Sequence, residues 1–144
     1  MNQVLEILVR GMILVAVIPI HECAHGMAAA WMGDPTAREM GRTTLNPLAH
    51  LDRFGSLLLL LTGLGWAKPV PVNARNFKNP KAGVAITALA GPAANLLLAL
   101  VVMVLFKLLL LLGVLPFTLG LILVILIQIT VQLAVFNLIP VPPL

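Results

Sequence analysis

The sequence predicts an all-α integral membrane protein with three spans and a short extended or re-entrant insertion between the first two. Of its 144 residues, 60% are hydrophobic and only 10% are charged, and the mean hydropathy is +1.07. A soluble domain carries about 25% charged residues, because it needs them to cover a water-facing surface. The apolar residues are also grouped into long runs, which is typical of a chain whose solvent is lipid.

Three apolar runs define the spans, at about residues 4–32, 82–106 and 119–138, and residues 34–81 form the insertion. Each run is of the length that crosses a hydrocarbon core about 30 Å thick, at about 1.5 Å per helical residue. Gly33, Asp34 and Pro35 are expected to end the first span, since proline does not continue a helix. The prolines after Ile139 are expected to end the third. Residues 1–144 are therefore interpreted as a single membrane core.

The insertion combines a short apolar run with an extended stretch. Residues 57–61 are apolar but too few to span a membrane. Residues 69–72 alternate proline and valine, which favours an extended edge strand because proline lacks the N–H needed to pair on one side. Such an edge can accept another extended segment by strand addition.

The basic residues are unevenly placed. Seven of the nine lie between the first two long runs, at Arg38, Arg42, Arg53, Lys68, Arg75, Lys78 and Lys81. Lys and Arg beside spans indicate the cytoplasmic face, so the N-terminus is expected outside and the insertion and C-terminus inside. A nucleic-acid-binding surface needs a water-soluble platform, so the expected partner is the lipid bilayer and not nucleic acid.

His21, Glu22 and His25 form a His-Glu-x-x-His motif on a predicted helix. A spacing of four places both imidazoles on one face, about 40° apart, where both can reach one metal ion. Glu22 lies between them in projection, beside the position of a zinc-activated water whose proton it can take. The alternative is a buried polar patch that pairs with neighbouring helices, although such a cluster is costly in an apolar helix. Cys23 points away and is expected to be a buried filler.

Two further polar positions have two interpretations each. Gly91 and the alanines around it allow close helix packing, and Pro92 frees the carbonyl of Ala88. Asn95 then either forms hydrogen bonds across that contact or presents its amide to a substrate, and the residues alone favour the structural role. His50 is either a metal ligand or a loop histidine, and the loop role is favoured.

Taken together, these motifs resemble those of the site-2 proteases, a family of intramembrane zinc metalloproteases, in its compact bacterial and archaeal form. The matching features are the His-Glu-x-x-His helix, a Gly-x-x-x-Asn helix at residues 91–95, and an Asn-x-x-Pro segment at residues 137–140. Residues 33–36, 45–50 and 65–73 are also similar to the family. The similarity covers nearly the whole chain from about residue 15.

This resemblance implies roles for five residues. His21 and His25 would bind Zn²⁺, Glu22 would be the general base, and Asn95 and Asn137 would line the active site or position the substrate strand. In the family the Asn-x-x-Pro segment continues into Leu-Asp-Gly, whose Asp is the third ligand. The sequence ends one residue before that position, so we expect a fragment of a longer chain, inactive by itself.

The expected function is therefore that of a zinc-dependent endopeptidase that cleaves transmembrane protein substrates. We expect a multi-pass protein in the cell membrane of a prokaryote, with its catalytic centre toward the cytoplasmic side. One alternative is a metal transporter. A transporter would need polar residues along a pathway, and the other spans offer no second row of them. The other is a non-catalytic membrane adaptor, against which the motif keeps its glutamate. The sequence does not indicate an oligomeric state.

Overall fold

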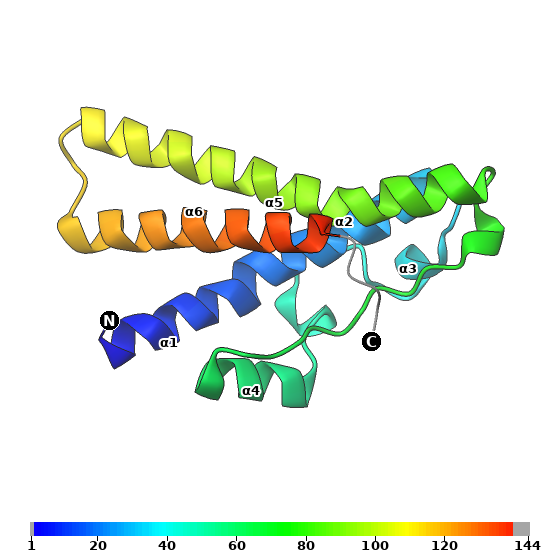
Figure 1. The fold of residues 1–144 in the computed structure, drawn as a ribbon, viewed down its shortest axis with the longest axis horizontal. Coiled ribbons are helices and arrows are strands. Elements are labelled where there is room, and N and C mark those ends of the chain that lie inside the picture. The colour runs from blue at the N-terminus through cyan, green and yellow to red at the C-terminus, as the bar shows by residue number, and fades with distance from the viewer. Residues whose placement is uncertain (1, 140–144) are drawn as a thin grey trace. The chain divides into compact units, whose positions relative to one another are not determined.

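The protein is described by a computed structural model that covers residues 2–139 (Figure 1). Its elements in chain order are α1 (Gln3–Met12), η1 (Ile13–Val17), α2 (Ile18–Trp31), α3 (Thr36–Glu39), η2 (Pro47–Ala49), α4 (Arg53–Thr62), η3 (Ala74–Asn76), α5 (Pro80–Leu111) and α6 (Phe117–Leu138). Within residues 2–139 the only strand-like pairing is an isolated antiparallel bridge between Leu51 and Ala67. The predicted all-helical fold is confirmed. Pro140, Pro142 and Pro143, expected to end the third span, lie outside the described residues.

Three helical segments are long and apolar enough to cross a membrane, namely Gln3–Trp31, Pro80–Leu111 and Phe117–Leu138. Many of their large apolar side chains are exposed, as lipid-facing helices require. The second segment continues past its expected end at Phe106, because no residue breaks the helix before Gly113, whose φ is +67°. The prediction of three spans is thus confirmed.

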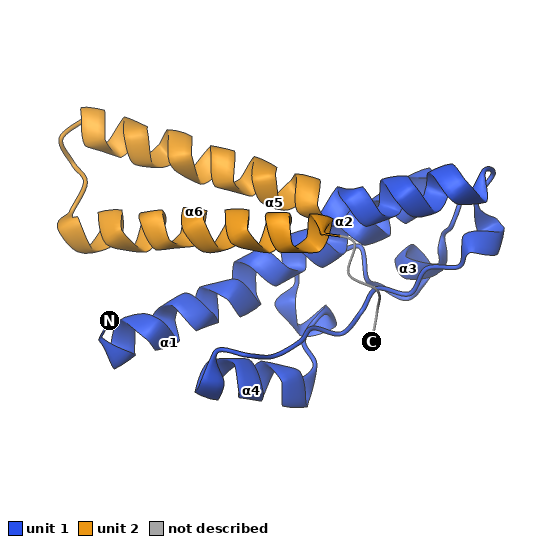
Figure 2. Ribbon diagram, viewed as in Figure 1, with its two compact units in different colours: residues 1–91 blue, residues 92–144 orange. Residues whose placement is uncertain are grey.

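The chain divides into two compact units, residues 1–91 and residues 92–144 (Figure 2). The first unit holds the first span, the insertion and the start of α5. The second holds the rest of α5 and all of α6. The division falls at Pro92, which lies inside α5 and cannot donate the helical hydrogen bond to Ala88.

The first span contains a widened turn. Residues Ile13–Val17 are π-helical, and the Ile18 N–H donates to the Ile13 carbonyl, five residues earlier. Pro19 follows at once and cannot donate to Val15, so a local change of helical register is expected there. Turns of this kind often lie at functional sites. This one directly precedes His21, and the sequence analysis did not predict it.

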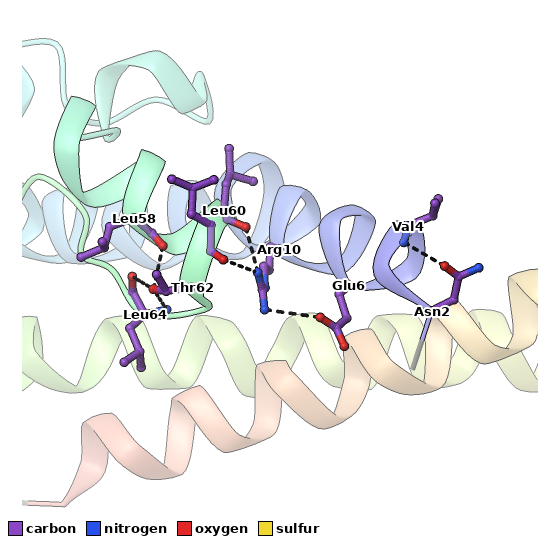
Figure 3. Close-up of polar contacts among 9 residues, drawn as sticks. Asn2, Val4, Glu6, Arg10, Leu58, Leu60, Thr62 and Leu64 are labelled. Carbon is purple, nitrogen blue, oxygen red and sulfur yellow. Dashed lines mark hydrogen bonds and ion pairs between the residues drawn. The ribbon is translucent and has the colours of Figure 1, made fainter.

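The insertion turns back along the first span. The guanidinium of Arg10 donates from Nη1 to the Leu60 carbonyl at 2.8 Å and to the Leu61 carbonyl at 3.2 Å, and from Nη2 it pairs with Glu6 at 3.5 Å (Figure 3). Arg10 precedes Trp31 by about 30 Å of helix at about 1.5 Å per residue. The end of α4 therefore lies beside the first span at a point far from Trp31. Residues 34–81 do not all stay at one end of that span.

Asp34 fastens the other end of the insertion. Its carboxylate is fully buried and accepts hydrogen bonds from the N–H and hydroxyl of Thr36, from the Asn73 N–H at 2.7 Å, and from the Asn76 amide at 2.9 Å. Burial by itself raises the pKa of this carboxyl, but the hydrogen bonds from Thr36, Asn76 and Asn73 outweigh it and hold the pKa at about 2. Asp34 thus joins the end of the first span to residues 73–76.

Candidate metal centre

The two histidines of the motif converge on one point. Both lie on α2, and their Nε2 atoms are 3.0 Å apart, with the rings edge to face. The His21 side chain is buried. Two nitrogens bound to one zinc ion at about 2.0–2.1 Å have a separation only slightly larger than this. The arrangement expected from a spacing of four is therefore present.

The protonation of His25 is determined by its second ring nitrogen. His25 Nδ1 lies 2.7 Å from the carbonyl oxygen of Thr87 on α5. A carbonyl oxygen only accepts, so Nδ1 carries a proton, and in the neutral ring Nε2 is then the nitrogen with the lone pair. A metal-binding histidine is oriented in this way by a carbonyl or carboxylate behind it. His25 is thus held in the tautomer that a metal ion needs.

Gly91 lets the backbone of α5 approach both rings. A Cβ atom added at Gly91 would overlap His25 Nε2 and would lie 2.7 Å from His21 Nε2. The Gly91 backbone also lies within hydrogen-bonding reach of His21. The close packing expected at Gly91 therefore takes place against the two histidines, and only glycine leaves room for them.

Glu22 lies between the histidine pair and the insertion. His25, His50 and Arg42 lie near enough to its carboxyl group to interact with it electrostatically, and the Val70 backbone lies within hydrogen-bonding reach. Its side chain is half-buried. The motif's carboxyl group is thus next to a candidate ligand and in contact with the extended part of the insertion. Cys23 is buried and contacts Met27, as a filler residue would.

His50 occupies the loop role and not that of a ligand. It is fully buried, and its Nε2 donates to the Thr44 carbonyl at 2.7 Å. No group of three or more His, Cys, Asp or Glu side chains within residues 2–139 is placed to hold a metal ion. A zinc site needs three or four protein ligands. The described residues thus supply two nitrogen donors that fit zinc and leave the rest of the ligand set open.

The two asparagines lie in the second unit, and the structure gives the local setting of each. Asn95 is fully buried and lies one turn after Gly91 on the same face of α5. Asn137 is exposed, and its amide donates to the Leu133 carbonyl at 2.7 Å on its own helix. Their roles toward a substrate stay predictions.

Sequence reasoning missed three contributors to this centre, Thr87, Arg42 and Val70. Thr87 lies one turn before Gly91 on the same face of α5, so its position was available from helical periodicity. Arg42 was interpreted only as a topology signal. No local pattern marks Val70, because its approach to Glu22 depends on the fold of the insertion.

Comparisons with known proteins show the family of this chain. Residues 11–118 match the family model of Peptidase family M50. A protein of Bacillus subtilis (strain 168), named "Putative zinc metalloprotease YwhC", is 43% identical over 136 residues, which are 91% of this chain and 62% of that relative. The chain thus spans less than two thirds of the length of the relative. No solved structure matches it. Since the matched region is most of the chain and contains the whole His-Glu-x-x-His motif, this chain belongs to Peptidase family M50, the site-2 protease family.

Proposed function

We propose that this chain carries the zinc-binding histidines and the general base of an intramembrane endopeptidase that cleaves transmembrane proteins. The observation that carries the proposal is the convergence of His21 and His25 at 3.0 Å, in one turn with Glu22, inside an apolar segment. An ionisable cluster at such a depth is costly unless it has a function. The metalloprotease name of the relative supports the same chemistry.

Each residue of the motif has a task in peptide hydrolysis. His21 and His25 hold the zinc ion, with Thr87 orienting His25 and Gly91 leaving space for both rings. When bound, zinc polarises the carbonyl and activates water for attack. Glu22 accepts the proton from water and returns it to the departing amine nitrogen, as a general base and then a general acid. Asn95 and Asn137 position the substrate strand.

The substrate is a membrane-spanning protein segment that has locally unwound, because a peptide bond inside a helix is shielded by its neighbours. The non-helical stretch before η3, which follows the bridge between Leu51 and Ala67, is the candidate edge, and its Val70 backbone lies within hydrogen-bonding reach of Glu22. Such an edge supports binding by strand addition. Non-helical backbone at membrane depth is tolerated where protein covers it or where it lines a cavity. The basic residues of the insertion favour the cytoplasmic side of a prokaryotic cell membrane.

The test uses the full-length protein that contains this chain, reconstituted in lipid vesicles with zinc and a single-span model substrate. We expect cleavage within the span, located by mass spectrometry of the products, and its loss on chelation. A zinc-loaded protein that leaves several single-span substrates intact would contradict the proposal. Uptake of metal by the vesicles without cleavage would indicate a transporter instead.

A further inference from the structure

Arg42 joins the extended part of the insertion to the helical turn that carries Glu22. The residue is only 7% exposed, and Nη2 donates to the Lys68 carbonyl at 2.6 Å. The guanidinium charge also acts on the Glu22 carboxyl group. Arginine is rarely buried without a partner, because the removal of its charge from water is costly. Its position therefore calls for a role beyond that of a surface charge.

Gly26 explains why Arg42 lies there. Gly26 is one turn after Glu22 on the same face of α2. A Cβ atom added to it would lie 3.1 Å from the methyl group of Thr43 and 3.3 Å from the Cβ of Ala37. The Arg42 N–H donates to the Ala37 carbonyl at 2.9 Å. Residues 37–43 thus pack directly on the helix at Gly26, which brings Arg42 beside Glu22.

The backbone of Lys68 is held on both sides of its α-carbon. Its carbonyl accepts from Arg42, and its N–H donates to the His50 carbonyl at 2.9 Å. In an extended chain the backbone groups of residues i and i+2 point toward the same edge. Two residues further on, the Val70 backbone lies within hydrogen-bonding reach of Glu22. The hold on Lys68 sets the position of Val70 relative to the Glu22 carboxyl group.

We propose that Arg42 is a positioning residue, which holds the Lys68 carbonyl and so fixes residues 68–70 against Glu22. The inference rests on the proposed function and adds a determinant of its geometry. The Glu22 carboxyl group then keeps a single orientation beside the histidine pair, and residues 68–70 keep a single position along it. Arginine suits this role because its planar fork donates in fixed directions, whereas a lysine ammonium has one mobile donor group.

The experiment compares Arg42→Gln and Arg42→Lys with the wild type in the zinc-loaded, full-length protein. Arg75→Gln is the matched control, since Arg75 is an exposed basic residue of the same insertion. Three quantities are measured: hydrogen–deuterium exchange of a peptide that covers residues 64–73, zinc stoichiometry, and kcat and KM on the single-span substrate.

Arg42→Gln is expected to keep its zinc, to raise exchange in residues 64–73 by about tenfold, and to lower kcat by about 10–100-fold. A side chain with a purely structural role would not lower kcat while zinc and KM stay near the wild type. Arg42→Lys should show exchange and kcat values between those of Arg42→Gln and the wild type. Arg75→Gln should match the wild type in both.

Wild-type exchange in residues 64–73, or a wild-type kcat, in a folded Arg42 variant would overturn the inference. If Arg42→Gln does not fold, Arg42→Lys decides by the same two measurements. Failure of the proposed function has a different signature, because the wild type itself then shows no cleavage. The exchange measurement still reports whether Arg42 holds the segment in that case.

Discussion

The ring of His25 is oriented by the backbone of Thr87, whose carbonyl accepts a 2.7 Å hydrogen bond from Nδ1. The acceptor belongs to the main chain, so the identity of side chain 87 has no part in this bond. The Thr87 hydroxyl is buried and has no hydrogen-bond partner among the described residues. The orientation of His25 thus depends on where α5 lies and not on a polar side chain.

Thr87→Val is therefore expected to leave zinc affinity within about twofold of the wild type. The substitution removes a buried hydroxyl without a partner, which is neutral or mildly stabilising when the shape is kept. Competition of the full-length protein with a fluorescent zinc chelator measures the affinity. A tenfold loss in Thr87→Val would show that the hydroxyl, and not only the carbonyl, supports the centre.

Gly91→Ala is expected to weaken zinc binding by at least about 10–100-fold, the range seen when groups that orient metal ligands are lost. The new methyl group would overlap His25 Nε2 and crowd His21 Nε2, so the rings must turn away from each other. Gly11→Ala is the control, because a Cβ added at Gly11 meets no atom within 4 Å apart from its chain neighbours and the backbone of its own helix. Equal zinc affinity in both variants would mean that α5 moves aside at little cost.

Glu22→Gln is expected to keep zinc and lose cleavage, with kcat falling by at least about 10²–10⁴-fold, the contribution typical of a general base. The amide has the size of the carboxylate but does not accept the proton. His21→Ala and His25→Ala are expected to lose zinc as well as activity. Substantial turnover by zinc-loaded Glu22→Gln would remove Glu22 from its assigned role.

The spans were predictable because the length of an apolar run is a local property. Lipid requires about 20 consecutive apolar residues in each helix, and the sequence displays them without reference to the fold. The extent of α4 was not predicted, although both of its ends carry local signals. Asp52 caps its first turn by accepting from the Gly55 N–H, and Gly63 ends it with φ at +82°. Its hydrogen bonds to Arg10 join residues about 50 positions apart, and no local pattern specifies them.

In the candidate site too, the local features were predictable from the sequence and the long-range contacts were not. Two histidines four positions apart on a helix must share a face, so their convergence followed from the sequence. The contacts of Glu22 with Val70 and Arg42 depend on how residues 34–73 fold back, which periodicity does not encode. Asp34 was assigned to the end of the first span and to the polar insertion, without a structural role of its own, yet it is buried and joins two segments almost 40 positions apart.

Asp34 makes the junction of α2 and the insertion sensitive to acid. Its folded-state pKa of about 2 lies below its ordinary value, so the ionised carboxylate stabilises the fold above about pH 4. That stability is lost as the pH falls toward 2 and the carboxylate is protonated. Thermal unfolding in detergent between pH 5 and pH 2 should show this loss in the wild type and a smaller one in Asp34→Asn. An identical pH dependence in the two proteins would assign the acid sensitivity to another group.

Arg10→Met is expected to loosen α4, because Arg10 supplies donors to carbonyls at the C-terminal end of that helix. Helix ends leave their last carbonyls without internal donors, and a cation there also interacts favourably with the helix dipole. Loss of these bonds should cost about 1–2 kcal/mol and appear as faster amide exchange in residues 53–62, with zinc binding unchanged. Methionine keeps an unbranched apolar stem, so the packing of the first span is largely preserved.

Glu6→Gln separates this effect from that of the ion pair. Glu6 Oε2 and Arg10 Nη2 are 3.5 Å apart on the same helix, and the Glu6 side chain is 36% exposed. Such a pair contributes at most about 1 kcal/mol in water, so Glu6→Gln should leave exchange in α4 close to the wild type while Arg10 keeps its bonds to Leu60 and Leu61. If Glu6→Gln loosens α4 as much as Arg10→Met does, the carboxylate is needed to orient the guanidinium, and α4 is held by the pair and not by Arg10 alone.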